Sequence, residues 1–156
     1  MNLPSQWTRM LILVCFVTVV SSPAQTFITL ANFSGTNGIQ PMYVTLAQGF
    51  DGNFYGTTSL KGGPQNGGMV FMMTPEGSLS VLHSFGSLDG YNPAAGMVLA
   101  ADGSFYGATA NGGGVPACGT LFNISPGGTF ALLHSFDMTD GCNPYATLVQ
   151  ATDGNL

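Results

Sequence analysis

The chain repeats itself with a period of 51 residues. Asp51-Gly52 recurs as Asp102-Gly103 and again as Asp153-Gly154. Two longer segments recur at the same interval: Phe54-Tyr55-Gly56 as Phe105-Tyr106-Gly107, and Leu82-His83-Ser84-Phe85 as Leu133-His134-Ser135-Phe136. In the first copy, Leu30-Ala31-Asn32-Phe33 stands where the Leu-His-Ser-Phe segment is expected. A fixed period of this length indicates a tandem-repeat architecture, in which a residue that recurs in every copy usually serves the fold.

Each copy is predicted to contain four short strands joined by tight turns. In the second copy the strands are expected at 96–100, 104–109, 119–124 and 129–136, with a glycine-rich loop over 111–117. Hairpin turns are expected at Asp51-Gly52, Pro75-Glu76-Gly77, Asp102-Gly103 and Pro126-Gly127-Gly128. These turns are favoured because glycine accepts a positive φ and proline presets its own φ at the second position of the turn. No stretch after residue 25 has a helical apolar period, so this part of the chain is predicted to be all-β.

The faces of the strands favour one architecture over others. Strict alternation places Val81, His83 and Phe85 on one face of a strand and Leu82 on the other, and residues 69–73 are apolar throughout. Strands that are apolar on both faces suggest sheets stacked on both sides. Four short strands in about 50 residues match one β-propeller blade. We therefore predict propeller-like four-stranded blades, with a β-solenoid or an irregular sandwich as the alternatives.

About two and a half repeats are present, over 26–80, 81–131 and 132–156. The last residue, Leu156, occupies the position of Phe54 and Phe105. Because propellers typically have 4–8 blades, the sequence is expected to be a piece of a longer reading frame. Open sheet edges in such a piece would favour self-association.

Residues 1–24 are predicted to be a cleaved secretory signal peptide. Arg9 supplies the positive charge, residues 10–20 form the apolar region, and Ser22-Pro23-Ala24 offers small residues before the cleavage site. An uncleaved membrane anchor is the alternative, but the apolar run is shorter than the roughly 20 residues that span a bilayer. The mature chain is thus expected to be secreted or at the cell surface, without membrane insertion.

Charge narrows the choice of partners. Only 6% of residues are charged, and cleavage would leave Lys61 as the single Lys or Arg against seven Asp and Glu. Such a surface cannot neutralise phosphates, so nucleic acid and anionic membranes are poor partners.

Two cysteines remain after cleavage, Cys118 and Cys142. Export permits a disulfide between them. The two positions are not repeat equivalents, so a disulfide would not be part of the repeat framework. Two partly buried free thiols are the alternative. Zinc is improbable because two cysteines without paired histidines do not provide four ligands.

The other polar residues give no catalytic constellation, and the sequence predicts no catalytic, cofactor-binding or metal-binding residue. His83 and His134 are repeat equivalents and are expected to be hydrogen-bonded within their strands. Asp51, Asp102 and Asp153 are expected to cap their own turns. Asp137, Asp140 and Asn143 could offer oxygens to Ca²⁺, but they form no Asp-x-Asp-x-Asp ladder.

Functional expectations therefore rest on the longer loops, 60–66, 87–92, 111–117 and 138–143. These loops differ between copies and carry Asp89, Asn92, Asp140 and Asn143. Because binding usually resides in variable loops on a rigid scaffold, we expect a non-catalytic module that binds a glycan or a surface protein. The alternative is a fragment of an extracellular hydrolase or lyase whose active site lies in other blades.

The recurring motifs resemble a known family. An Asp-Gly-x-Asn-Pro-like segment, a DG-x-(F/Y)-YG-(T/A)-T hairpin and a GG…G-x-(V/L)-F strand followed by LHSF together resemble the GloVer tandem repeat, named for Gloeobacter and Verrucomicrobia. The resemblance covers residues 26–156 and implies an exported, surface-associated, propeller-like protein of the "choice-of-anchor" type. Kelch repeats share the glycine doublet at Gly62-Gly63 and Gly112-Gly113 but lack the Tyr and Trp that should follow it.

Overall fold

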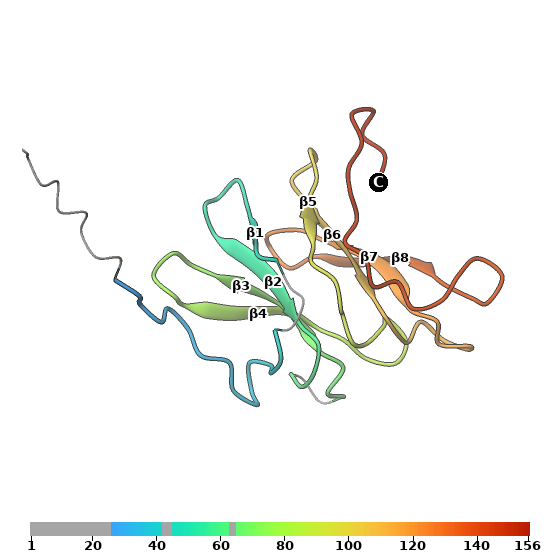
Figure 1. The fold of residues 1–156 in the computed structure, drawn as a ribbon, viewed down its shortest axis with the longest axis horizontal. Helices are drawn as coiled ribbons and strands as arrows, with labels where there is room; N and C mark the ends of the chain where they lie inside the picture. Colours follow the sequence, from blue (N-terminus) through green and yellow to red (C-terminus); the bar gives the residue numbers. More distant parts are fainter. Residues whose placement is uncertain (1–25, 42–44, 63–64) are drawn as a thin grey trace, which may run out of the picture.

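The computed structural model describes residues 26–41, 45–62 and 65–156, so the predicted signal peptide and its cleavage site lie outside the described residues. Within those ranges the chain is all-β and forms two four-stranded antiparallel sheets, shown in Figure 1. The first sheet has the order β1-β2-β3-β4, with strands Ala47–Gln48, Phe54–Thr58, Met69–Met73 and Leu79–Ser84. The second has the order β5-β6-β7-β8, with strands Val98–Leu99, Phe105–Thr109, Thr120–Ile124 and Phe130–Ser135.

Each sheet contains the four strands predicted for one copy of the repeat, although its last strand, β4 or β8, crosses the predicted copy boundary at 80/81 or 131/132. The four predicted hairpin turns are confirmed, because each joins two neighbouring antiparallel strands. The strands begin and end within about two residues of the predicted limits. The first strand of each sheet is the shortest, with two residues.

The Asp-Gly turns share one local geometry. Asp51 Oδ1 accepts a hydrogen bond from the backbone N–H of Asn53, and Gly52 has a φ of +83°. A side chain at Gly52 would be strained at that φ, whereas glycine adopts it without a steric penalty. The third copy forms the same turn, in which Asp153 accepts from the N–H of Asn155. The turn is therefore set by local sequence in all three copies.

The glycine of each Phe-Tyr-Gly segment makes room for an aromatic ring on the neighbouring strand. Gly56 pairs with Phe71 across the strands, and a Cβ on Gly56 would lie 2.6 Å from Phe71 Cζ. Gly107 and Phe122 repeat this relationship at the same 2.6 Å. The recurrence of Gly and Phe at a fixed spacing thus reflects cross-strand packing.

The two sheets pack face to face, and the core lies between them. The buried side chains of this core come from both sheets and from the connection between them: Tyr55, Val70, Phe85, Met97, Phe105, Phe122 and Ile124. Phe85 follows β4 and meets Phe122 edge to face at 5.1 Å. Aromatic pairs in such offset or edge-to-face arrangements add to the stabilisation from burial alone.

The expectation that Val81, His83 and Phe85 share one face was wrong for Val81. The β3–β4 ladder contains a bulge between Val70 and Phe71, so that Val81 lies opposite Phe71 and His83 lies opposite Val70. Because Val70 and Phe71 are adjacent on β3, their partners lie on opposite faces of the sheet. The extra residue at the bulge interrupts the alternation that the sequence pattern assumed.

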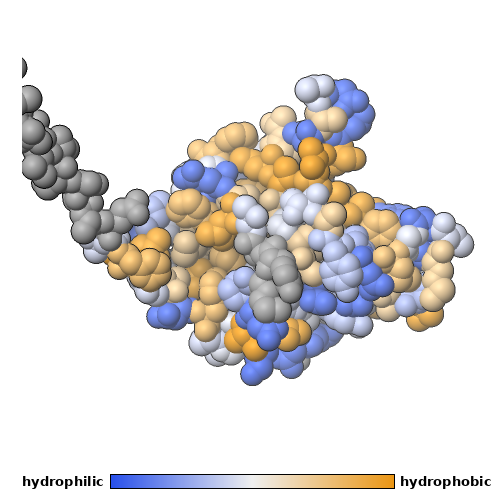
Figure 2. Space-filling model, viewed as in Figure 1, coloured by the Kyte–Doolittle hydropathy of each residue, from blue (hydrophilic) through white to orange (hydrophobic). Residues whose placement is uncertain are grey.

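The connections fall into two groups in space. The short β1–β2 and β5–β6 turns lie at the top of Figure 1, and the longer β2–β3 loop and β4–β5 connection lie at the bottom. We call the side with the longer connections the loop face. In Figure 2, apolar surface gathers at the base of the C-terminal loop.

Candidate functional site

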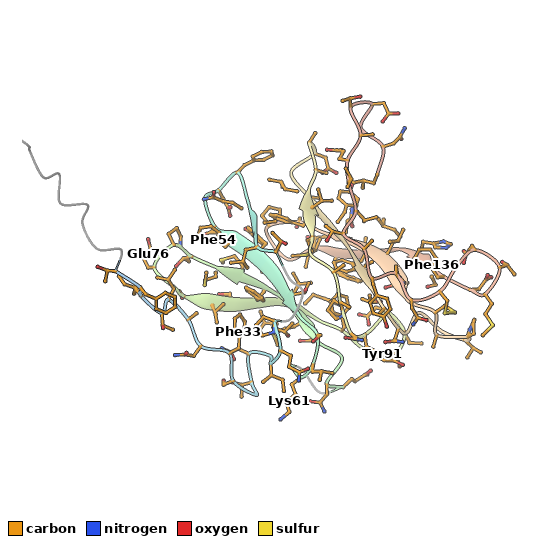
Figure 3. The ribbon with its side chains drawn as sticks, viewed as in Figure 1. Phe33, Phe54, Lys61, Glu76, Tyr91 and Phe136 are labelled. Atoms are coloured by element: carbon orange, nitrogen blue, oxygen red, sulfur yellow. A yellow bond between two sulfur atoms is a disulfide. The ribbon has the colours of Figure 1, made fainter. Side chains whose placement is uncertain are left out.

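The loop face is built from the β2–β3 loop, the β6–β7 loop and the connections that follow β4 and β8. Two hydrogen bonds hold its central part together. The backbone N–H of Asn92 donates to the Gly67 carbonyl in the β2–β3 loop, and the Asn92 carbonyl accepts from the N–H of Ala110, which follows β6. Tyr91 forms an antiparallel bridge with Asn111 and lies on the loop face in Figure 3. The loops of neighbouring repeats are therefore joined to each other through the backbone.

Asn92 and Asn143, two predicted binding residues, occupy equivalent backbone positions. Both have a φ of +57°, a conformation that asparagine tolerates better than most residues. The N–H of Asn143 donates to the Cys118 carbonyl, as that of Asn92 does to Gly67. The Asn143 amide group also donates to the Ala110 carbonyl at 2.8 Å. These contacts give both asparagines a role in fixing the loops.

Asp89 and Asp140, the other two predicted binding residues, are each bonded to a histidine of the same copy. The Asp89 Oδ2 to His83 Nε2 distance is 2.7 Å, and the Asp140 Oδ2 to His134 Nε2 distance is 2.6 Å. In each case the other carboxylate oxygen accepts a backbone N–H, from Gly86 for Asp89 and from Asp137 for Asp140. Both oxygens of each carboxylate are thus engaged within the chain.

The first copy explains why these residues occur together. Asn37 occupies the position of Asp89 and accepts the backbone N–H of Ser34 in the same way. The residue at the histidine position of that copy is Ala31. Where the histidine is absent, the carboxylate is replaced by a neutral amide. The histidine and the aspartate therefore form one structural unit, a pairing that the sequence analysis missed and that comparison of the three copies could have revealed.

The His83–Asp89 pair also contacts the second sheet. The His83 ring is stacked on Phe130, with centroids 3.8 Å apart and planes 5° from parallel. The Asp89 carbonyl accepts a hydrogen bond from the Thr120 hydroxyl at 3.0 Å. The pair therefore links the loop face to the interface between the sheets. The prediction that each histidine is hydrogen-bonded is correct, but the partner is in the following loop rather than in the strand.

The structure joins Cys118 and Cys142 as a disulfide, with Cα atoms 4.4 Å apart. Their equivalents in the preceding copy, Gly67 and Tyr91, are also in contact, because a Cβ on Gly67 would lie 3.0 Å from Tyr91 Cβ. The cysteines thus occupy a contact that the repeat already makes. The bond connects the β6–β7 loop to the connection after β8.

A shallow hollow of about 350 Å³ opens on the loop face beside this network. Its lining includes Gln65, Ser87, Leu88 and Asp89. Gln65 Oε1 accepts the backbone N–H of Ser87 at 3.0 Å, so the two loops that border the hollow are connected. Leu88 is 79% exposed at its rim. The hollow combines an exposed apolar side chain with polar groups on an ordered backbone.

The aspartates of the short turns lie away from this hollow. Asp51 accepts a hydrogen bond from the Tyr55 hydroxyl at 2.7 Å, and this bond holds the Asp51 pKa below its usual value. Burial of Tyr55, together with the bond to Asp51, raises the tyrosine pKa to about 12. Asp102 repeats the arrangement with Tyr106 at 2.8 Å, and the backbone N–H of Ser104 is the main cause of its lowered pKa. These carboxylates cap their turns, in agreement with the sequence analysis.

Within 26–41, 45–62 and 65–156, no three His, Cys, Asp or Glu side chains converge on a point that could hold a metal ion. The same part of the chain contains no helix that is long and apolar enough to cross a bilayer.

Comparison with known proteins gives one family. The family described as the Gloeobacter/Verrucomicrobia repeat matches residues 16–156. No curated protein matches the chain significantly.

Proposed function

The chain belongs to the Gloeobacter/Verrucomicrobia repeat family, and on that premise we propose that it is an exported or cell-surface binding module without catalytic activity. Its sheets would be blades of a propeller-like assembly, and its loop face would bind a glycan or a surface protein. Three features support this proposal: the arrangement of the sheets, the disulfide and the distribution of differences between the copies.

The arrangement of the sheets supports propeller-like blades. Each repeat forms one antiparallel sheet, and β1 lies next to β5, so that the first strands of both sheets adjoin. The faces of the two sheets stack through Tyr55 and Phe105. Blades around a central axis have this relationship, with their first strands innermost and their faces in contact.

The disulfide supports export. Structural disulfides form and persist in oxidising compartments outside the cytosol. The Cys118–Cys142 bond therefore agrees with the signal peptide predicted over residues 1–24.

The binding proposal rests mainly on which positions of the repeat carry different residues in different copies. Buried aromatic side chains of the strands recur from copy to copy, as with Phe71 and Phe122. The hollow combines both kinds of position: Gln65 and Leu88 are replaced by Pro116 and Thr139 in the next copy, whereas Asp89 recurs as Asp140. A constant scaffold that presents variable loops is typical of binding proteins. No specific observation favours the hydrolase or lyase alternative.

A binding experiment with matched variants tests this proposal. The purified chain is applied to a glycan array and to immobilised surface proteins, together with Leu88→Asp on the loop face and Phe50→Asp on the opposite, short-turn side. Leu88 and Phe50 are both 79% exposed, so the two changes are comparable in their effect on folding. We expect Leu88→Asp to weaken binding at least tenfold and Phe50→Asp to leave it unchanged. Binding lost with Phe50→Asp and retained with Leu88→Asp would contradict the proposal.

A further inference from the structure

The segment that precedes the first sheet has the contacts of a fourth strand. Phe33 meets Phe71 of the first sheet edge to face, with centroids 4.9 Å apart and planes at 62°. Phe85, which follows β4, meets Phe122 of the second sheet at 5.1 Å and the same 62°. Figure 3 shows Phe33 beneath the first sheet. Residues around Phe33 therefore pack on the first sheet as the end of β4 packs on the second.

Contacts on both sides of Phe33 extend this equivalence. The Leu30 carbonyl lies against Gly77, and the equivalent Leu82 carbonyl lies near Gly128. On the other side, Ile39 bridges Leu60 as Tyr91 bridges Asn111. The segment 30–39 thus follows the same path relative to the first sheet as 82–91 follows relative to the second. In Figure 1 this blue segment runs beneath β3 and β4.

Residues 27–32 and their equivalents, 79–84, differ in their backbone hydrogen bonding. Residues 79–84 form β4 and pair with β3, apart from Leu82 at the bulge. The equivalent residues 27–32 pair with none of the strands that the structure describes. Phe27 is 93% exposed, whereas Leu79 at the equivalent position in β4 is half-buried. The segment has the placement of a strand but lacks the sheet to which such a strand belongs.

We propose that residues 27–32 are the outer strand of a composite sheet and that they bind the third strand of a further repeat unit of this family. The bound strand would be antiparallel and would have the sequence type of Met69–Met73 or Thr120–Ile124. Applying the β3–β4 register, Phe27 lies opposite the residue equivalent to Met73, and Ile28 lies opposite the equivalent of Met72. β3 and β7 of this chain cannot fill the place, because each is already paired on both edges.

Strand addition of this kind supplies both affinity and specificity. The main-chain groups of an unpaired strand form a ladder with the incoming strand, and alternate side chains give specificity. Here the incoming Phe of the Met-Val-Phe-Met-Met type would lie opposite Thr29, as Phe71 lies opposite Val81. This inference is independent of the proposed loop-face binding, since it concerns the face of the first sheet that carries Phe71 and points away from the second sheet.

Hydrogen exchange of the purified chain with a synthetic peptide provides the test. The probe is a peptide with the sequence of residues 67–75, and the control is the same composition in scrambled order. We expect the probe to slow exchange at the amides of 27–32 at least tenfold and the scrambled peptide to have no effect. Protection only at the outer edges of β4 or β8, or none at all, would overturn the proposal.

Two proline variants test whether the protection reflects a ladder. Consecutive N–H groups of a strand point to opposite edges, so only one of Ile28→Pro and Thr29→Pro removes a donor to the incoming strand. We expect one variant to abolish protection and the other to retain most of it. Equal effects of the two variants would contradict strand pairing. Protection of the amides of 27–32 that appears without peptide and rises with chain concentration would show that these residues pair with a second copy of the chain. That result would also overturn the proposal.

Discussion

The ring of Tyr55 stacks on the ring of Phe105 across the interface between the sheets, with centroids 4.1 Å apart and planes at 27°. At the same time the Tyr55 hydroxyl donates a hydrogen bond to Asp51 Oδ2 at 2.7 Å. One side chain therefore connects the hairpin turn of its own repeat to the core that it shares with the next. Tyr55 is 1% exposed, so its stacked ring is buried, whereas Asp51 at the other contact is exposed to solvent.

The ionisation of Tyr55 should occur at unusually high pH. Its pKa is raised from 10.0 to about 12, mainly by burial and next by the bond to Asp51. Because the folded pKa lies above the unfolded one, the contribution of this group to stability is complete below pH 10.0 and is lost as the pH rises toward 12. Tyrosinate absorbance should therefore show a late-titrating component that is missing in Tyr55→Phe. A titration curve that Tyr55→Phe leaves unchanged at its high-pH end would contradict this assignment.

The two His–Asp pairs should differ in strength. His83 and Asp89 side chains are 20% and 28% exposed, whereas those of His134 and Asp140 are 47% and 39% exposed. Exposed pairs are more strongly screened by solvent and contribute less. Double-mutant cycles with alanine should give a coupling of about 1 kcal/mol for His83–Asp89 and about 0.5 kcal/mol or less for His134–Asp140. Equal coupling energies, measured by denaturant unfolding, would show that burial does not determine the strength of these pairs.

Loss of the disulfide should destabilise the fold without changing its secondary structure. Cys118 and Cys142 are separated by 24 residues in sequence, and a loop of this size is worth about 3 kcal/mol in a chain-entropy estimate. The Cys118→Ala/Cys142→Ala variant should therefore have a free energy of unfolding lower by about that amount, with an unchanged far-UV circular dichroism spectrum. Peptide mass mapping without reductant should show the two cysteines in one linked species. Two unlinked peptides would contradict the pairing.

Export remains a prediction from residues 1–24, which lie outside the described part of the structure. Expression in a bacterial host with an intact secretory pathway should give a product outside the cytosol whose new N-terminus is near Gln25. Intact-mass measurement and N-terminal peptide sequencing check this outcome. Accumulation of an unprocessed form that begins at Met1 in the cytosol would count against the proposed localisation.

The features that the sequence predicted correctly are those that depend on local residues. The turn at Asp51-Gly52 needs one glycine at positive φ and one carboxylate that caps it, and both are visible in the sequence. Pairing of each repeat into one sheet followed from the strand and turn spacing. The bulge at Val70 and Phe71 was not predictable in this way, because a ladder with one extra residue has no signature in an alternating pattern.

The internal contacts of the candidate site were not predicted, because they connect different parts of the repeat. Asp89 was proposed as a binding residue from its place in a loop, and its bond to His83, six residues earlier, was not foreseen. The disulfide was left open because Cys118 and Cys142 are not repeat equivalents; only the structure shows that Gly67 and Tyr91 are already neighbours in the previous copy. Such pairings depend on the path of the connections between the sheets, which local patterns do not determine.

The Tyr55–Phe105 pair provides the sharpest test of the packing of one repeat sheet on the next. A double-mutant cycle with Tyr55→Ala and Phe105→Ala measures the interaction between the two rings separately from the loss of each side chain. If the sheets stack as described, the cycle should give a coupling of about 1 kcal/mol, the range found for aromatic pairs in contact. A coupling indistinguishable from zero, in variants that remain folded, would contradict the stacking of the repeats.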